Sequence, residues 1–436
     1  MDKNQKKERQ DMPTTLPDYY SQEKARVLEQ CVQCGVCARK CPIVPYTELR
    51  DVNPREIQRR VIEFLQTGTP DDIVFTRAFA CMQCFQCVAH DCPCGLNPLH
   101  IHEIIRWEYR RQGMLDAYTD PQASDSTHRV LASIQVSQAE YARLSTPTKP
   151  APSRYVFFPG CNVYFQPEKI LTALDLLDLI AEDYAFVPGL DLCCGNVCIY
   201  SGDIEKAETR TKEFLETLTA YQPEVVILWC STCQSRWKTT LSHLTNLPFE
   251  MISFPQFLAK HLARLPFKQK LVKTVTLHEA CKAAFTGVDL TGARDVLRQI
   301  PGIELREMPR HGEKTVCCGG GAMNFFPESF ARFRDDRLRE AAHTQAEVLA
   351  DVCHFCHEVF IAQEAHYPYA ITNYVTLVAE ALDIARKDTF KTYKQWGDPE
   401  RILADAAPHI AGSPYSADTI RTVVETVFSP EGNRSE

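Results

Sequence analysis

Two short cysteine runs near the amino terminus have the spacing of iron–sulfur ligands. Residues 31–42 read CVQCGVCARKCP and residues 81–93 read CMQCFQCVAHDCP. The first run follows the C-x2-C-x2-C-x3-C-P pattern that holds [4Fe–4S] cubane clusters, and its proline turns the chain away after the fourth cysteine. The second run repeats the pattern with one extra residue before its last cysteine. We therefore expect two cubane clusters in this part of the chain.

The predicted cubane ligands are eight cysteines, four from each run. They are Cys31, Cys34, Cys37 and Cys41 in the first run and Cys81, Cys84, Cys87 and Cys92 in the second. In two-cluster proteins the fourth cysteine of a run binds the other cluster. We therefore expect Cys92 to join the first three cysteines of the first run, and Cys41 to join the first three of the second. Cys94 is an alternative to Cys92, which we favour because it precedes a proline. Zinc knuckles would use two CxxC pairs or mixed Cys/His sets, and two triple runs do not fit them.

Ten further cysteines form two copies of a five-cysteine pattern in the rest of the chain. Each copy has a single cysteine, then an adjacent pair followed by glycine, then a CxxC pair. The first set is Cys161, Cys193, Cys194, Cys230 and Cys233, and the second is Cys281, Cys317, Cys318, Cys353 and Cys356. Structural zinc takes four ligands, so five thiols are one too many. Adjacent cysteines point their side chains apart, which suits a centre with more than one metal atom.

Strands that end at cysteines are expected to position both sets. β-branched or aliphatic runs occupy 154–161, 224–230, 273–281 and 346–353, with helical stretches at 168–184 and 328–345. This alternation predicts parallel sheets, and ligands of such sheets bind beyond the carboxyl ends of the strands. Gly195 and the run 319–321 follow the cysteine pairs, where glycine permits positive φ and close approach of the backbone to an inorganic core.

The remainder of the sequence limits the function classes. The chain has 436 residues, 20 of them cysteine, and a net charge of −8, which disfavours nucleic acid as a partner. Its charged amino terminus has no secretory signal, and we find no apolar run of the ~18 residues that a membrane-spanning helix needs. A cytosolic chain with this many cysteines is expected to bind metal or be redox-active. Dinucleotide, P-loop and flavin motifs are missing, so a partner must deliver or collect electrons.

Together the two cysteine patterns resemble a known family. The C…CCG…CxxC constellation is similar to the CCG domains of heterodisulfide reductase and its relatives. Two ferredoxin-type runs followed by two such domains look like the fused catalytic subunit of the membrane-linked heterodisulfide reductase. They look equally like the iron–sulfur subunits of glycolate oxidase and of anaerobic glycerol-3-phosphate dehydrogenase. The resemblance covers about residues 25–385 and 18 of the 20 cysteines, and leaves Cys94 and Cys198 as bystanders.

The resemblance implies one or two noncubane [4Fe–4S] clusters, held by the five-cysteine sets, that bind and cleave a disulfide. The ten cysteines of the two sets are then the catalytic ligands. The expected partners are other redox subunits, a flavoprotein or a membrane cytochrome. The expected setting is anaerobic and cytoplasmic, with contact to the inner face of the membrane only through a partner. Two alternatives stay open: a relay between a flavoprotein and a quinone or other carrier, without its own substrate, and zinc in the two repeats.

The expected fold is a multi-domain α+β arrangement, in which a mostly helical two-cluster ferredoxin-like domain precedes two repeated α/β CCG domains. The expected segments are an extension (1–24), the ferredoxin-like domain (25–114), a linker (115–153), the CCG domains (154–270 and 271–385), and a helical segment with a polar tail (386–436). His278, His354 and His357 lie beside predicted ligands. Each could donate a proton or contact a cluster sulfide, or could equally be a packed side chain. His90, inside the second run, is a weaker candidate of the same kind.

Overall fold

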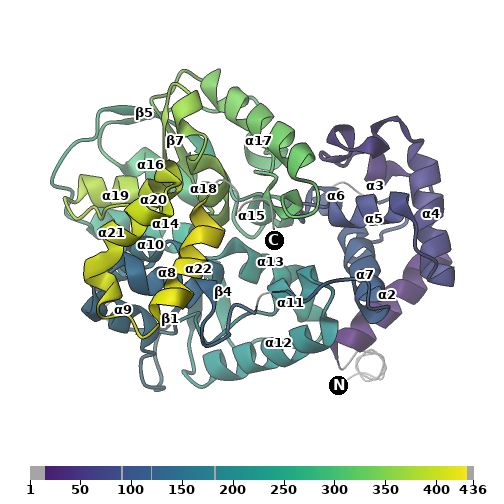
Figure 1. Cartoon of the computed structure of the whole chain (residues 1–436), viewed down its shortest axis with the longest axis horizontal. Helices are drawn as coiled ribbons and strands as arrows, with labels where there is room; N and C mark the ends of the chain where they lie inside the picture. The colour runs from purple at the N-terminus through teal and green to yellow at the C-terminus, as the bar shows by residue number, and fades with distance from the viewer. Residues whose placement is uncertain (1–14, 90–91, 119, 181–182, 430–436) are drawn as a thin grey trace.

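The computed structural model describes residues 15–89, 92–118, 120–180 and 183–429 (Figure 1). A helical domain at the amino terminus packs beside two α/β domains, and a group of helices closes the carboxyl terminus. This arrangement confirms the expected α+β multi-domain fold. Among the described residues, no helix has the length and apolar character needed to cross a membrane.

The first domain consists of short helices joined by the loops that carry the cysteine runs. Its elements are α2 (Leu16–Gln30), α3 (Val36–Arg39), η1 (Val44–Tyr46), η2 (Glu48–Asp51), α4 (Pro54–Thr67), α5 (Asp72–Phe79), α6 (Gln86–Ala89) and α7 (Pro98–Arg111). Helix α4 begins at Pro54 behind an Asn53 side chain that accepts a hydrogen bond from the backbone N–H of Arg55, and it ends at Gly68 with φ of 71°. Proline at the start and glycine after the end is the asymmetry typical of helices, and it fixes both ends of α4.

The first α/β domain contains one four-stranded sheet. Its elements are β1 (Tyr155–Phe158), η3 (Asn162–Phe165), α10 (Pro167–Ile180), β2 (Tyr184–Phe186), α11 (Asn196–Tyr200), α12 (Ile204–Thr219), β3 (Val225–Leu228), α13 (Ser231–Thr239), η4 (Leu241–His243), β4 (Glu250–Ser253), α14 (Phe254–His261) and η5 (Leu262–Arg264). The strands are all parallel, in the order β2-β1-β3-β4, with Phe157 paired to Phe186 on one side and to Ile227 on the other.

The second α/β domain repeats this topology. Its elements are β5 (Lys273–His278), α15 (Cys281–Thr286), α16 (Gly292–Gln299), β6 (Ile303–Leu305), η6 (Gly312–Lys314), η7 (Gly320–Ala322), α17 (Pro327–Ala342), β7 (Val348–Asp351), α18 (His354–Ile361), η8 (Glu364–His366), β8 (Ala370–Asn373) and α19 (Tyr374–Ala381). The order β6-β5-β7-β8 matches that of the first sheet strand for strand. The predicted repeat, its parallel sheets and the four cysteine-ending strands are thereby confirmed.

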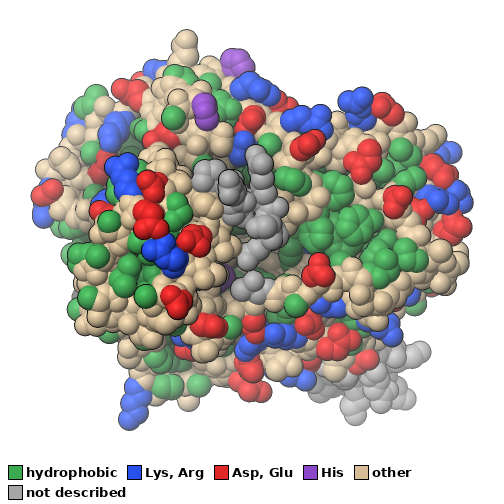
Figure 2. Space-filling view, in the orientation of Figure 1, with side chains coloured by type: hydrophobic (Ala, Val, Ile, Leu, Met, Phe, Trp, Pro, Cys, Tyr) green, Lys and Arg blue, Asp and Glu red, His purple; other side chains and the backbone are tan. Residues whose placement is uncertain are grey.

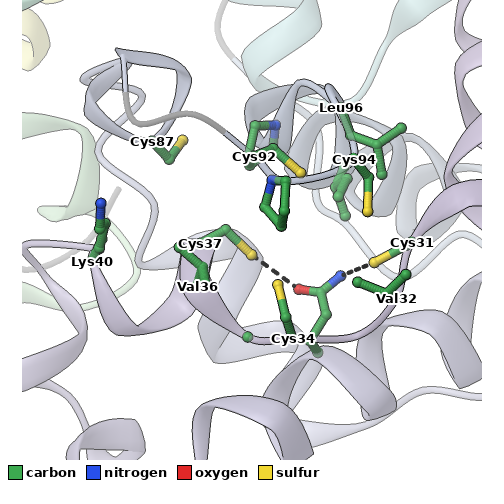
Figure 3. A pocket seen from close by; sticks show the side chains of 15 residues that line it. Cys31, Val32, Cys34, Val36, Cys37, Lys40, Cys87, Cys92, Cys94 and Leu96 are labelled. Atoms are coloured by element: carbon green, nitrogen blue, oxygen red, sulfur yellow. Dashed lines mark hydrogen bonds between the residues drawn. The ribbon is translucent and has the colours of Figure 1, made fainter.

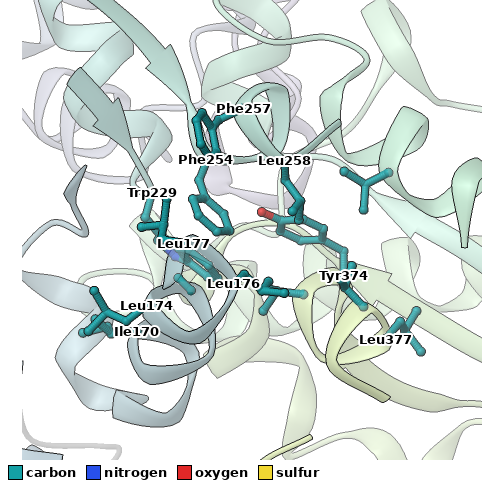
Figure 4. Packing of buried hydrophobic residues seen from close by; sticks show 14 of the residues in the cluster. Ile170, Leu174, Leu176, Leu177, Trp229, Phe254, Phe257, Leu258, Tyr374 and Leu377 are labelled. Carbon is teal, nitrogen blue, oxygen red and sulfur yellow. The ribbon is translucent and has the colours of Figure 1, made fainter. Parts of the chain in front are cut away.

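A continuous hydrophobic core joins the two α/β domains (Figure 4). Trp229, which follows β3, packs its ring 5.5 Å from that of Phe254 and 6.2 Å from that of Tyr374 in the second domain. Leu176 and Leu177 of α10 belong to the same cluster. Because packed interiors resist displacement, this shared core fixes the carboxyl ends of the two sheets relative to each other.

The stretch 115–153 contains helical structure and not only a connection. Its helices are α8 (Thr127–Gln135) and α9 (Gln138–Ser145), and α8 packs against η3 and against the carboxyl-terminal helices. Val130, Leu131 and Ile134 provide the buried face of α8. The surrounding Ser, Thr, Pro and Asp residues conceal this short apolar pattern in the sequence.

The carboxyl-terminal segment is helical in the described residues. It contains α20 (Thr389–Trp396), α21 (Pro399–Ile410) and α22 (Ala417–Phe428). The predicted polar tail from 430 to 436 lies outside the described residues, as do residues 1–14 of the predicted extension. Helix α2 runs across the expected boundary between that extension and the first domain.

Candidate metal centres

The strand ends bring each five-cysteine set to one edge of its sheet. Cys161 and Cys230 lie just beyond β1 and β3, and Cys281 and Cys353 just beyond β5 and β7. Each CxxC pair begins a helix, because Cys230 and Cys353 are the residues before α13 and α18. Both CxxC pairs therefore lie at helix N-termini, near the positive end of the helix dipole.

A single cavity of about 340 Å³ lies between the two α/β domains. All ten cysteines of the two sets line it: Cys161, Cys193, Cys194, Cys230 and Cys233 from the first domain, and Cys281, Cys317, Cys318, Cys353 and Cys356 from the second. The Sγ atoms of Cys161 and Cys193 are 3.6 Å apart, and the equivalent Cys281 and Cys317 are also 3.6 Å apart. The two halves therefore present matching thiol groups to one shared cavity.

Contacts among the thiols lower the pKa of particular cysteines in each set. Hydrogen bonds from the thiols of Cys193 and Cys233 lower the pKa of Cys194. In the second set, hydrogen bonds from Cys281 and Cys318 lower the pKa of Cys317. A thiol must lose its proton to bind a metal. Each set therefore contains a cysteine that loses its proton more readily than an ordinary thiol.

Glycine is required where the cysteine pairs turn. Gly195 has φ of +84°, and a Cβ there would lie 2.8 Å from the backbone oxygen of Ala207. Gly319 has φ of +90°, and a Cβ on Gly320 would lie 2.6 Å from the Phe355 ring. The expectation of positive φ holds for the first glycine after each pair, and the close contacts at Gly195 and Gly320 are with neighbouring protein atoms.

A smaller cavity in the helical domain contains cysteines from both amino-terminal runs (Figure 3). Its cysteines are Cys31, Cys34, Cys37, Cys87, Cys92 and Cys94. The Gln58 amide lies between two of them: its Nε2 donates to Sγ of Cys31 at 3.6 Å, and its Oε1 accepts from Cys37 at 3.2 Å. Both Cys92 and Cys94 reach this cavity, so both candidates for the fourth ligand are close to the first run.

The thiols of Cys41, Cys81 and Cys87 lie near the buried guanidinium of Arg77. Burial raises the pKa of Cys81, Cys84 and Cys87, and the charge of Cys41 adds to each of these shifts, as is expected of neighbours. The Arg77 guanidinium, 3% exposed, donates to Sγ of Cys41 at 3.4 Å and to the carbonyl of Cys37 at 3.1 Å. Arg77 thus contacts one residue of each expected ligand group.

Comparisons with known proteins agree with this geometry. A cysteine-rich (CCG) domain family matches residues 155–237 and 275–360, and a 4Fe-4S dicluster domain family matches residues 30–97. The chain is similar to a component of the dihydromethanophenazine:CoB–CoM heterodisulfide reductase from Methanosarcina barkeri, with 24% identity over 82% of this chain and 95% of that protein. This chain is an iron–sulfur oxidoreductase subunit. Its amino-terminal helical domain is the dicluster domain, and its two α/β domains are cysteine-rich domains.

Two other relatives match a similar share of this chain but have different names. A component of the fumarate reductase (CoM/CoB) of Methanothermobacter marburgensis is 25% identical over 78% of this chain and 68% of its own length. A probable membrane-anchored ferredoxin of Chromohalobacter salexigens is 22% identical over 81% of this chain and 60% of its own length. Proteins similar to this chain therefore have names that describe different redox roles.

The predicted histidines differ in their surroundings. His354 lines the shared cavity, and burial lowers its pKa to about 3. His278 is the buried last residue of β5, and its Nδ1 accepts a hydrogen bond from Nε of Arg337 at 3.1 Å. Carboxylates lie against both nitrogens of His357, Asp351 at 2.7 Å and Asp388 at 2.8 Å. His354 alone of these three lines the cavity, and His90 lies outside the described residues.

The two leftover cysteines are also in different positions. Cys94 lines the Gln58 cavity, whereas Cys198 is buried in α11, 3% exposed, near the hydroxyl of Tyr118. Of the two aromatic residues beside CxxC pairs, Trp229 lies in the hydrophobic core and Phe355 lines the shared cavity.

Sequence reasoning missed the polar residues that surround the thiols. Arg77 and Gln58 lie on helices of ordinary composition, and Lys282 follows a predicted ligand without any motif. No local signal could have identified them, because each reaches its thiols through the folding of distant segments.

Proposed function

We propose that this subunit reduces a disulfide to two thiols, or carries out the reverse reaction, in the cavity shared by its cysteine-rich domains. The observation that supports this most is the convergence of ten thiols, five from each domain, on one space of about 340 Å³. That volume is at the lower end of the range for small-molecule sites. Reduction of one disulfide consumes two electrons and two protons, so two metal centres facing one cavity suit the stoichiometry.

The residues around the cavity fit two iron–sulfur clusters in their donor atoms and in the space left by glycine. Each complete set of five cysteines would hold one cluster, of noncubane type, and the dicluster domain would hold two cubanes. Thiolate is the ligand that such clusters prefer. When bound, a cluster at the cavity would supply one-electron chemistry and a metal that binds sulfur. The protein residues hold the ligands apart, limit water and orient the substrate.

The ligand groups form a series from the surface to the cavity. Val32, beside Cys31, is 67% exposed, so the Cys31 group lies at the surface. The Cys84 thiol is close enough to Cys317 for the two charges to interact, and Met82 and Gln83 line the shared cavity. The dicluster domain thus reaches the second cysteine-rich set directly. This series supports entry of electrons at the surface of the dicluster domain.

A partner protein is part of this proposal. Hydrophobic side chains gather on the visible face of the dicluster domain, over α5 and α6 (Figure 2). Exposed apolar patches of this kind often mark contacts with other proteins. We propose that a flavoprotein or a membrane cytochrome binds there, and that the chain works in the cytoplasm and reaches the membrane only through that partner.

The test is direct assay of disulfide reduction. Anaerobically purified chain is supplied with a reduced viologen dye and 2-hydroxyethyl disulfide, and both dye oxidation and thiol formation are recorded. We expect two thiols for every two dye molecules oxidised, with loss of at least tenfold in rate for Cys318→Ser. Dye oxidation by a quinone analogue without thiol formation from any disulfide would instead establish the relay function.

A further inference from the structure

The two five-cysteine sets differ at the residue that follows the first cysteine. Asn162 follows Cys161 in the first set, and Lys282 follows Cys281 in the second; both side chains line the shared cavity. An ammonium group acts through its charge in any orientation, whereas a neutral amide donates only from its nitrogen and accepts only at its oxygen. What Asn162 presents to the cavity therefore depends on the group that holds its amide.

The Asn162 amide is held by His128 of α8. Its Oδ1 lies 2.9 Å from Nε2 of His128, and because an amide oxygen can only accept, Nε2 carries the ring proton and donates it. Burial lowers the pKa of His128 to about 4, so the ring is neutral at neutral pH and has this one N–H. The Asn162 oxygen is thereby engaged. Its Nδ2, which has no hydrogen-bond partner among the described residues, is the donor left for the cavity.

The contacts of His128 favour positioning over proton transfer. Its side chain is buried, and its ring packs edge-on against that of Phe165, which lines the cavity, with centroids 4.5 Å apart. Gln135, at the end of the same helix, donates to the Phe165 carbonyl at 3.0 Å. Nδ1 of His128 is buried without a hydrogen-bond partner in the described part of the chain. A relay needs a partner on each ring nitrogen, whereas positioning needs only the one that Asn162 provides.

We propose that His128 is a positioning residue that orients Asn162, so that Nδ2–H of Asn162 donates to a sulfur atom of the metal centre held by the first five-cysteine set. This inference rests on the cluster proposed for that set. Hydrogen bonds to the sulfurs of an iron–sulfur cluster stabilise its more negative, reduced state and so raise its reduction potential. The second set has Lys282 in place of the amide, so this donor distinguishes the two centres from each other.

The test is a redox titration of the anaerobic holoprotein, followed by its paramagnetic signals. The signal of the first set is assigned as the one lost when Cys193 and Cys194 are both replaced with serine. Asn162→Ala removes the donor, His128→Leu removes the group that orients it, and His128→Gln keeps an N–H near the position of Nε2. His261→Leu changes a half-buried histidine on α14, which does not line the cavity, and serves as the control.

We expect Asn162→Ala and His128→Leu to lower the potential of the first-set signal by about 59 mV, a tenfold change in the ratio of reduced to oxidised centre for one electron. His128→Gln and His261→Leu should keep the potential, and the signal of the second set should not move. An unchanged potential in Asn162→Ala overturns the inference, as does a shift in His128→Gln equal to that in Asn162→Ala. The cluster itself stands in both cases, because its signal is still present. If the serine replacements remove neither signal nor iron, the proposed cluster and the inference both fail.

Discussion

The Arg236 guanidinium and the Glu103 carboxylate form an ion pair with no exposed surface, and this pair joins the first cysteine-rich domain to the dicluster domain. Nη2 of Arg236 donates to Oε1 of Glu103 at 2.7 Å, and both side chains are 0% exposed. The other oxygen of Glu103 accepts from the Tyr20 hydroxyl at 2.7 Å. Arg236 also donates to Asn196, which lines the shared cavity next to the Cys193–Cys194 pair.

Breaking this pair should destabilise the protein at the contact between the two domains. Glu103→Ala leaves a buried guanidinium without its counter-ion, and we expect a loss of about 3–5 kcal/mol in the free energy of unfolding, measured by denaturant titration under anaerobic conditions. Glu56→Ala removes an exposed pair with Arg59 on α4 and serves as the control, with no measurable change expected. A Glu103→Ala protein as stable as the wild type would contradict the structural role of the pair.

The titration of the Glu103 carboxylate should make the stability of the protein depend on pH. Burial acts to raise the pKa of Glu103, but the charge of Arg236 and the hydrogen bonds hold it below the usual 4.5. A depressed pKa contributes stability that is present above the unfolded value and is lost as the pH falls through the folded one. Below about pH 4.3 the wild type should therefore lose stability more steeply than Glu103→Gln. Parallel curves for the two proteins between pH 3 and 7 would show that Glu103 does not titrate in this way.

Arg77 should set the reduction potential of a dicluster centre. Its positive charge and its hydrogen bond to Cys41 stabilise the more negative, reduced state, so Arg77→Gln should lower one midpoint potential by roughly 60 mV. Arg77→Lys keeps the charge and should have a smaller effect. The potentials are read from paramagnetic signals in a redox titration, with exposed Arg55→Gln as the control. An unchanged potential in Arg77→Gln would exclude this role.

The choice between Cys92 and Cys94 can be decided by iron content. Both thiols line the cavity that contains Cys31, and the prediction of Cys92 depends on its following proline. Cys92→Ala should lose or convert one cluster, removing up to about four iron atoms per chain, whereas Cys94→Ala should keep them all. The opposite result would make Cys94 the ligand.

Much of the fold could be predicted because it depends on local sequence patterns. Cysteine spacing indicated both domain types, and the aliphatic runs ending at Cys161, Cys230, Cys281 and Cys353 indicated the two inner strands of each sheet. The outer strands β2, β4, β6 and β8 were missed. They have three or four residues each, and lie at the sheet edges, where a short run is enough to pair with an inner strand.

The arrangement of the two thiol sets around one cavity could not be predicted from the sequence. The repeat indicated two sets, but their meeting depends on core contacts such as that of Trp229 with Tyr374. The same is true of Arg236 and Glu103, which are 133 positions apart and have no pattern in common. Single buried polar contacts between domains follow from tertiary packing, which local periodicity does not describe.

The central claim, that all four cysteine groups hold iron–sulfur clusters, is tested most directly by metal analysis of the full chain purified without oxygen. Four [4Fe–4S] clusters predict about 16 iron atoms per chain and no zinc. Replacing both Cys193 and Cys194 with serine should remove about four of them, and the equivalent change at Cys317 and Cys318 another four. About eight iron atoms together with stoichiometric zinc, unchanged in iron by either replacement, would contradict the claim.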